Sequence, residues 1–141
     1  MSKVLGIDYG TKRVGLAETD DNQIIATRLT SIHAKDLIEY LISYFNKNEV
    51  DTIVVGMPVR LDGSATNSTE SVNNFISHLK RKFSAKKVIT IDERFTSKIA
   101  SQTIANSGMN KKKRQNKELI DQVSAVIILQ DYLVMKEKGF I

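Results

Sequence analysis

The hydrophobic pattern of this chain changes its period part-way, and the order of the two periods limits the folds that the chain can adopt. Apolar residues first occur in three extended segments, 4–8, 13–19 and 23–31, which are joined by short turns. Such short connections predict an antiparallel meander of three strands. The spacing then becomes helical, and further apolar strands at 51–55 and 87–91 alternate with helices. A meander followed by alternating helices and strands predicts an α/β fold with a mixed sheet.

Four helices are expected from the spacing of apolar residues and from helix-start and helix-stop residues. They cover about 37–45, 67–83, 96–108 and 117–136. The second begins at Asn67, which is followed three residues later by Glu70 as in a capping box. The apolar stripe expected for the last helix is Leu119, Ile120, Val123, Val126, Ile127 and Leu133.

The length and composition of the chain are those of one domain. A chain of 141 residues with 41% hydrophobic residues has enough apolar material for a single core, so residues 1–141 are expected to form one domain. No apolar run approaches the roughly 20 residues of a membrane helix, and Met1 leads directly into a strand rather than a signal sequence. We therefore expect a cytoplasmic protein without a membrane partner.

The absence of cysteine restricts the metal sites that the chain can build. Because the sequence has no Cys, a bound metal needs oxygen ligands or the two histidines, His33 and His78. These histidines are far apart in sequence and far from any acidic motif, so we interpret both as ordinary surface or helix residues.

Positive charge is concentrated in one segment of the chain. The formal charge is +5 at pH 7, which is compatible with a polyanionic partner but also simply with solubility. Lys111, Lys112, Lys113, Arg114 and Lys117 crowd between Gly108 and Glu118. This crowding makes the segment a candidate arm that binds nucleic acid.

Acidic residues follow two of the expected strands, and a third acid lies near the start of the last helix. Asp8 comes directly after the apolar run Val4–Ile7, and Glu93 lies just beyond the strand 87–91. Asp121 lies in the first turn and a half of the last helix. Each has a structural alternative, because Asp is common in turns and an acid near a helix N-terminus is favoured by the helix dipole.

The expected topology would bring these acids together. Ligands of open sheets of this type bind outside the carboxyl ends of the parallel strands, where Asp8 and Glu93 would lie, and Asp121 could join them from a packed helix. Two unit charges about 4 Å apart repel by about 4 kcal/mol at an effective dielectric constant of 20. Three such carboxylates therefore imply a bound cation, and all-oxygen ligation suits Mg²⁺ or Mn²⁺.

The chain resembles the YqgF family of ribonuclease-H-like nucleases, whose members are described as Holliday-junction resolvases and as pre-16S ribosomal RNA nucleases. The resemblance runs nearly from end to end and rests on four motifs in order. These are Gly6-Ile7-Asp8-Tyr9-Gly10 with Arg13-Val14-Gly15, Gly56-Met57-Pro58 with Asp62-Gly63, Asp92-Glu93-Arg94-Phe95-Thr96-Ser97, and Ile120-Asp121 with Ala125 and Leu129.

The resemblance implies a ribonuclease-H-like fold, with a three-strand antiparallel meander plus two parallel strands in a five-stranded mixed sheet flanked by helices. It also implies a metal-dependent endonuclease, a hydrolase acting on ester bonds, in which Asp8, Glu93 and Asp121 are the catalytic acids and hold two Mg²⁺ or Mn²⁺ ions. The expected substrate is the 5′ end of pre-16S ribosomal RNA during ribosome biogenesis, and the alternative is a Holliday junction in branched DNA. The residues expected to bind nucleic acid are Lys12, Arg94, Lys112, Lys113 and Arg114, although Arg94 could instead pair with a neighbouring acid.

Two other functions remain open on the sequence alone. The Asp8-x-Gly10-Thr11 turn also resembles the phosphate loop of sugar kinases and actin-like ATPases, but those proteins close two domains on a nucleotide and this chain has the length of one. A nucleic-acid-binding module without catalytic activity would use the basic arm and keep the acids as structural residues. The sequence does not distinguish RNA from branched DNA, a monomer from a homodimer, one metal from the other, or one cleavage position from another.

Overall fold

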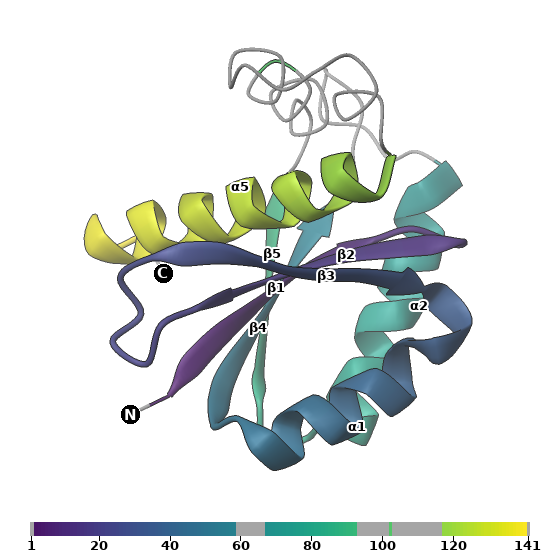
Figure 1. Ribbon diagram of the computed structural model, residues 1–141, viewed down its shortest axis with the longest axis horizontal. Coiled ribbons are helices and arrows are strands. Elements are labelled where there is room, and N and C mark those ends of the chain that lie inside the picture. The colour runs from purple at the N-terminus through teal and green to yellow at the C-terminus, as the bar shows by residue number, and fades with distance from the viewer. Residues whose placement is uncertain (1, 59–66, 93–101, 103–116, 141) are drawn as a thin grey trace.

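The computed structural model describes residues 2–58, 67–92, 102 and 117–140, which form a five-stranded sheet with helices on both faces (Figure 1). The strands are β1 (Lys3–Tyr9), β2 (Arg13–Thr19), β3 (Ala26–His33), β4 (Val50–Met57) and β5 (Lys87–Asp92). The helices are the short η1 (Ala34–Asp36), α1 (Leu37–Lys47), α2 (Asn67–Lys82) and α5 (Lys117–Glu137).

The order of the strands confirms the expected mixed sheet. The sheet runs β3-β2-β1-β4-β5, with β1 at its centre. The pairs β1–β2 and β2–β3 are antiparallel, whereas β1–β4 and β4–β5 are parallel. The carboxyl ends of β1, β4 and β5 therefore lie at one edge of the sheet.

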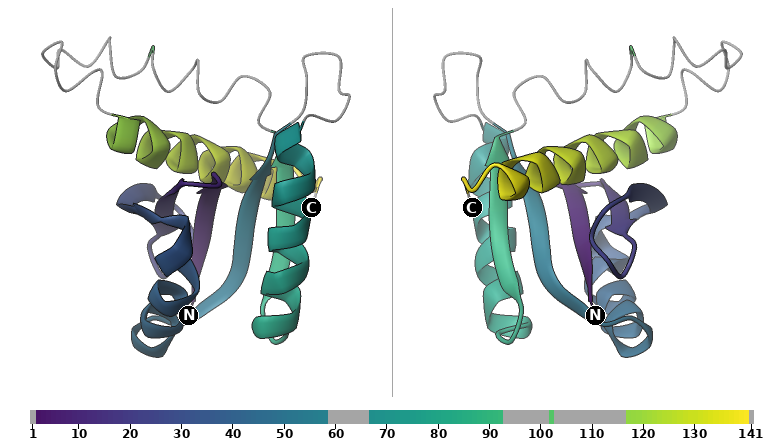
Figure 2. Two further views of the ribbon diagram at one scale, coloured as in Figure 1. Left: turned by 90° about the vertical axis from the view of Figure 1, so that its right-hand side faces the viewer. Right: turned by 90° about the vertical axis from the view of Figure 1, so that its left-hand side faces the viewer.

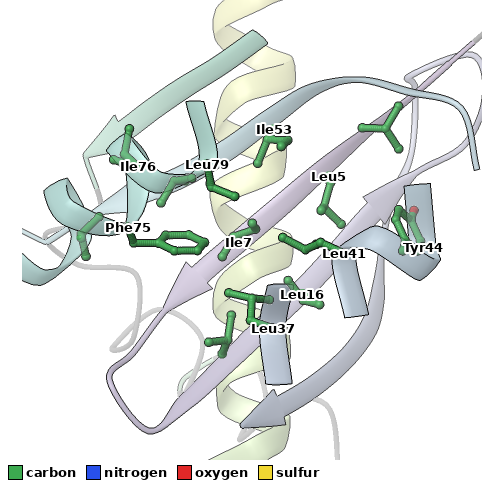
Figure 3. Packing of buried hydrophobic residues seen from close by; sticks show 14 residues of the cluster. Leu5, Ile7, Leu16, Leu37, Leu41, Tyr44, Ile53, Phe75, Ile76 and Leu79 are labelled. Atoms are coloured by element: carbon green, nitrogen blue, oxygen red, sulfur yellow. The ribbon is translucent and has the colours of Figure 1, made fainter. Parts of the chain in front are cut away.

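The alternating side chains of β1 divide the core into two layers. Leu5 and Ile7 belong to the layer that α1 and α2 cover, and Figure 3 shows this layer with α5 behind the sheet. Val4 belongs to the opposite layer, which is built with α5, the green-to-yellow helix in Figure 2. Because side chains of a strand alternate, Asp8 lies on the same face as Val4, the face covered by α5.

The third strand begins three residues later than the sequence indicates. Residues 23–25 belong to the loop before β3, because the Asp20 carboxylate accepts hydrogen bonds from the backbone amides of Ile24 and Ile25, each at 2.8 Å. Gln23 adopts a positive φ of 57° within this loop. The backbone hydrogen bonds hold the pKa of Asp20 below its ordinary value, and they compete with strand pairing at this position.

The helix expected at 96–108 lies outside the described residues, apart from position 102. Among the helices that the structure describes, none is both long enough and apolar enough to cross a membrane.

Candidate active site

A pocket lies at the carboxyl ends of the parallel strands, where the chain turns from β1 into β2. Its volume is about 280 Å³, and its lining includes Asp8, Lys12, Arg13 and Asp121. Asp8 comes from the end of β1, Lys12 and Arg13 come from the turn and the start of β2, and Asp121 comes from α5. The pocket therefore brings together two acids and two bases from opposite ends of the chain.

The turn between β1 and β2 is tight because of Gly10. The backbone amide of Gly10 donates a 3.0 Å hydrogen bond to the carbonyl oxygen of Arg13. A β-carbon at position 10 would lie only 2.6 Å from that oxygen, so a larger residue would force the turn open. The turn places Lys12 and Arg13 in the same pocket lining as Asp8, the next-to-last residue of β1.

Asp121 reaches the pocket because α5 packs directly on the backbone of the sheet. Gly15 is the cross-strand partner of Asp8. A β-carbon on Gly15 would overlap the backbone carbonyl of Asp121, so only glycine allows the helix this approach. One residue thus sits opposite Asp8 and beneath Asp121 at once, which explains why the two acids share a pocket.

Gly6 extends the same contact along the helix. A β-carbon at Gly6 would lie 3.1 Å from both the Ala125 carbonyl oxygen and the Leu129 β-carbon. Ala125 and Leu129 are themselves fully buried. Two glycines on neighbouring strands therefore form the surface on which α5 rests.

Arg13 forms an ion pair with Asp121 inside the pocket. Its Nε donates a 2.8 Å hydrogen bond to Oδ2 of Asp121, and the two side chains are 43% and 19% exposed. The hydrogen bond and the charge of Asp121 raise the pKa of Arg13 above its ordinary value, so the guanidinium stays charged. Its positive charge offsets part of the repulsion that the sequence predicted between the acids.

Arg13 is a functional candidate that the sequence reasoning did not select. Its position was the signal that could have indicated this, because Arg13 begins β2, and β2 pairs with β1, the strand that carries Asp8. The strand pattern alone does not reveal that this side chain meets a helix residue more than a hundred positions later.

The predicted site residues divide into those that the structure describes and those that it does not. Asp8, Asp121 and Lys12 line one pocket. Glu93, Arg94, Lys112, Lys113 and Arg114 lie outside the described residues. Asp92, which precedes Glu93 in the chain, ends β5 at the same edge of the sheet, two strands or about 10 Å from β1.

The acids in the pocket fit a divalent cation in their donor chemistry. Asp8 and Asp121 offer carboxylate oxygens, which Mg²⁺ and Mn²⁺ prefer. Arg13 uses Oδ2 of Asp121, and the other oxygen has no hydrogen-bond partner among the described residues. Within the described ranges, no three His, Cys, Asp or Glu side chains are close enough to hold a metal.

Comparison with known proteins identifies the family of this chain. The family model for RuvX, described as Holliday junction resolvase, matches residues 2–135. The chain belongs to the RuvX family. A relative in Flavobacterium johnsoniae is 49% identical over 96% of this chain and 99% of its own length. A relative in Bacteroides thetaiotaomicron is 40% identical over the same shares, and both are provisionally named pre-16S rRNA nucleases.

A solved structure supports the fold independently. RuvC from T. thermophilus, determined in complex with a Holliday junction substrate, superposes with a TM-score of 0.57 over 94% of this chain and 96% of that chain. At 14% sequence identity this likeness concerns the fold, and it confirms the expected ribonuclease-H-like class.

Membership of the RuvX family confirms the expected enzyme class, a nuclease that hydrolyses phosphodiester bonds. Nucleases of this family generally use divalent metal ions, and nucleic acid is the partner class.

Proposed function

We propose that residues 1–141 form one RuvX-type nuclease domain that uses two Mg²⁺ or Mn²⁺ ions to cut the 5′ end of pre-16S ribosomal RNA. The observation that carries this proposal is the meeting of Asp8 and Asp121 in one pocket at the carboxyl edge of the sheet. The provisional names of the relatives favour the ribosomal RNA precursor as substrate.

In this proposal Asp8, Glu93 and Asp121 hold the metal ions. When bound, such ions stabilise charge on the phosphate oxygens and make water a nucleophile at neutral pH. The Arg13 guanidinium fixes the orientation of the Asp121 carboxylate through its 2.8 Å hydrogen bond. Lys12 lines the same pocket and would bind a phosphate of the substrate. Arg94 follows Glu93 in the chain and would bind another phosphate.

The test is cleavage of two labelled substrates by the same preparation. A ribosomal RNA precursor and a four-way DNA junction are each incubated with Mn²⁺, with Mg²⁺ and with a chelator. We expect metal-dependent cleavage at the 5′ end of the RNA and none with chelator. Cleavage of the junction alone would favour the resolvase alternative, which the description of the RuvX family supports. Tight binding without cleavage in either metal would favour a binding module.

The basic arm gives a second prediction, which concerns salt. Each phosphate contact contributes about −0.7 to −0.9 to the slope of log binding constant against log salt concentration. Replacing Lys112, Lys113 and Arg114 together by alanine should therefore flatten this slope by about 2 to 3 units. Binding is measured by anisotropy of the labelled substrate across a salt series.

The chain offers a matched control for this measurement. Lys80, Arg81 and Lys82 are also two lysines and one arginine, and they occupy the last turn of α2. That turn lies just before β5 begins, at the edge opposite the acid pocket. Alanine at these three positions should leave the slope nearly unchanged. Equal flattening in both triple variants would mean that only the net charge of the protein matters. An unchanged slope in the variant at 112–114 would mean that the basic arm does not contact the substrate.

A further inference from the structure

A second pocket opens at the same edge of the sheet, on the opposite face from the acids. Its volume is about 390 Å³, and it lies between the end of β1, the start of α1 and one face of α2. Tyr9 and Thr11 line this pocket and also line the acid pocket. The two pockets therefore flank the same three-residue stretch of chain.

One wall of this second pocket is aromatic and apolar. The rings of Tyr9 and Phe75 stack with their centroids 4.2 Å apart and their planes 11° apart. Ala34, Leu37 and Ile38 complete the apolar lining. Phe75 belongs to the core shown in Figure 3. Phe75 is 7% exposed and Tyr9 is partly exposed, so Tyr9, backed by Phe75, is the aromatic surface that a flat, weakly polar ring can contact.

The opposite wall consists of polar side chains from α2. Ser71, Asn74 and His78 lie on the face of the helix that also carries Phe75, at spacings of three and four residues. Asn74 and His78 are exposed, and neither side chain has a hydrogen-bond partner among the described residues. The pocket is thus lined by an amide and an imidazole that have no partner within the described part of the chain, together with the hydroxyl of Ser71.

The start of α2 is fixed relative to the sheet, so this wall is held in place. The hydroxyl of Thr69 donates a 2.6 Å hydrogen bond to the carbonyl oxygen of Pro58, directly after β4. Buried Val72 and Leu79 anchor the helix on the other side. The position of Asn74 and His78 relative to Tyr9 is therefore set by the core rather than by a loop.

We propose that this second pocket binds an unpaired nucleobase next to the phosphodiester bond that the enzyme cuts. The inference rests on the proposed nuclease function and adds a specificity site to it. Proteins recognise unpaired bases by stacking them on aromatic or apolar side chains and by hydrogen bonds to their edges, and this pocket offers both. A nucleic-acid strand that crosses the sheet where β1 turns into β2 would place a phosphate on the Asp8 side and a neighbouring base on the Tyr9 side. His78, which we interpreted from the sequence as an ordinary surface or helix residue, becomes a base contact.

The first test detects base binding without cleavage. Because the chain has only two histidines, the ring protons of His78 and His33 can be followed by NMR in metal-free protein. Nucleoside 5′-monophosphates should move the His78 signals and leave those of His33, which does not line the pocket, in place. Ribose 5-phosphate, which has no base, should move neither. No movement of His78 with any nucleotide, or equal movement with ribose 5-phosphate, overturns the proposal.

The second test measures sequence preference on a substrate with randomised nucleotides around the cut. The wild type should prefer one base beside the cleaved bond, and Asn74→Ala should reduce that preference about tenfold because a base edge loses its hydrogen bonds. Asn73→Ala is the matched control, since Asn73 is an exposed neighbour outside the pocket lining. An unchanged preference in Asn74→Ala overturns the base pocket while leaving the nuclease intact. If the wild type cuts no substrate but nucleotides still move the His78 signals, the nuclease function is wrong and the base pocket stands.

Discussion

Asp8→Asn is expected to lower the rate of phosphodiester cleavage by about three orders of magnitude or more, because a neutral amide is a poor ligand for a divalent cation. The same change should remove the stabilisation of the protein by metal. A ligand at 100 times its dissociation constant adds about 2.7 kcal/mol to the free energy of unfolding, so Mn²⁺ should raise the melting temperature of the wild type and barely that of the variant. Four melting curves measure this, with chelator and with Mn²⁺ for each protein.

Asp36→Asn is the control for the loss of one negative charge. Asp36 is exposed and precedes α1 without capping it through a side-chain hydrogen bond. This variant should keep full activity and the full response to Mn²⁺. In chelator, Asp8→Asn should melt at or above the wild type, because Asp8 shares its pocket with a second acid. If it melts below the wild type and still responds fully to metal, then Asp8 is a structural turn residue.

Gly15→Ala is expected to damage stability and activity together. At a strand position with free space around it, a change from glycine to alanine would stabilise the protein by a few tenths of a kcal/mol, because alanine lowers the conformational entropy of the unfolded chain. Here the new β-carbon overlaps the Asp121 carbonyl, so we expect a loss of about 3 kcal/mol of unfolding free energy and roughly 10 °C in melting temperature. Moving α5 also moves Asp121, and a displacement of about 1 Å can cost about 100-fold in rate.

Gly6→Ala provides the graded comparison in the same interface. Its β-carbon would meet its neighbours at 3.1 Å, a contact that shifts of a few tenths of an ångström relieve. We therefore expect a loss of about 1 kcal/mol with most of the activity retained. Denaturant unfolding and initial cleavage rates of both variants test this order. Equal effects at the two positions would show that the direct contact between Gly15 and Asp121 does not set the position of the acid.

The sheet topology was accessible from the sequence because each part of it depends on local pattern. The turn residues between the first strands predict the meander, and apolar runs separated by helical spacing predict the parallel strands. The position of Asp8 at the strand end follows from the same local signals. The start of β3 differed by three residues, because the Asp20 side chain binds two backbone amides that a strand would otherwise use. The strand also continues two residues beyond its expected end.

The buried face of α5 could not be predicted in the same way. The expected stripe was only partly right. Val126 and Leu133 are partly buried against the core, but the buried positions of α5 are Ser124, Ala125, Ile128, Leu129 and Tyr132. The helix is apolar around most of its circumference, so hydrophobic periodicity says little about which side is covered. The close contact of Gly6 with Ala125 and Leu129 determines which side of α5 is buried, and this contact exists only when the helix is packed on the sheet. The meeting of Arg13 with Asp121 is hidden from the sequence for the same reason.

The order of Asp8 and Asp121 in the chain determines which of the two acids is synthesised first. Asp8 precedes Asp121 by more than a hundred residues, so it emerges from the ribosome well before the helix α5 that carries Asp121. The central strand and the first core layer contain no residue of that helix, so they can form earlier, since folding during translation proceeds from the N-terminus. A nascent chain can therefore hold Asp8 at the end of its central strand before Asp121 is present. Docking of α5 on the sheet is then the step that brings Asp8 and Asp121 into one pocket.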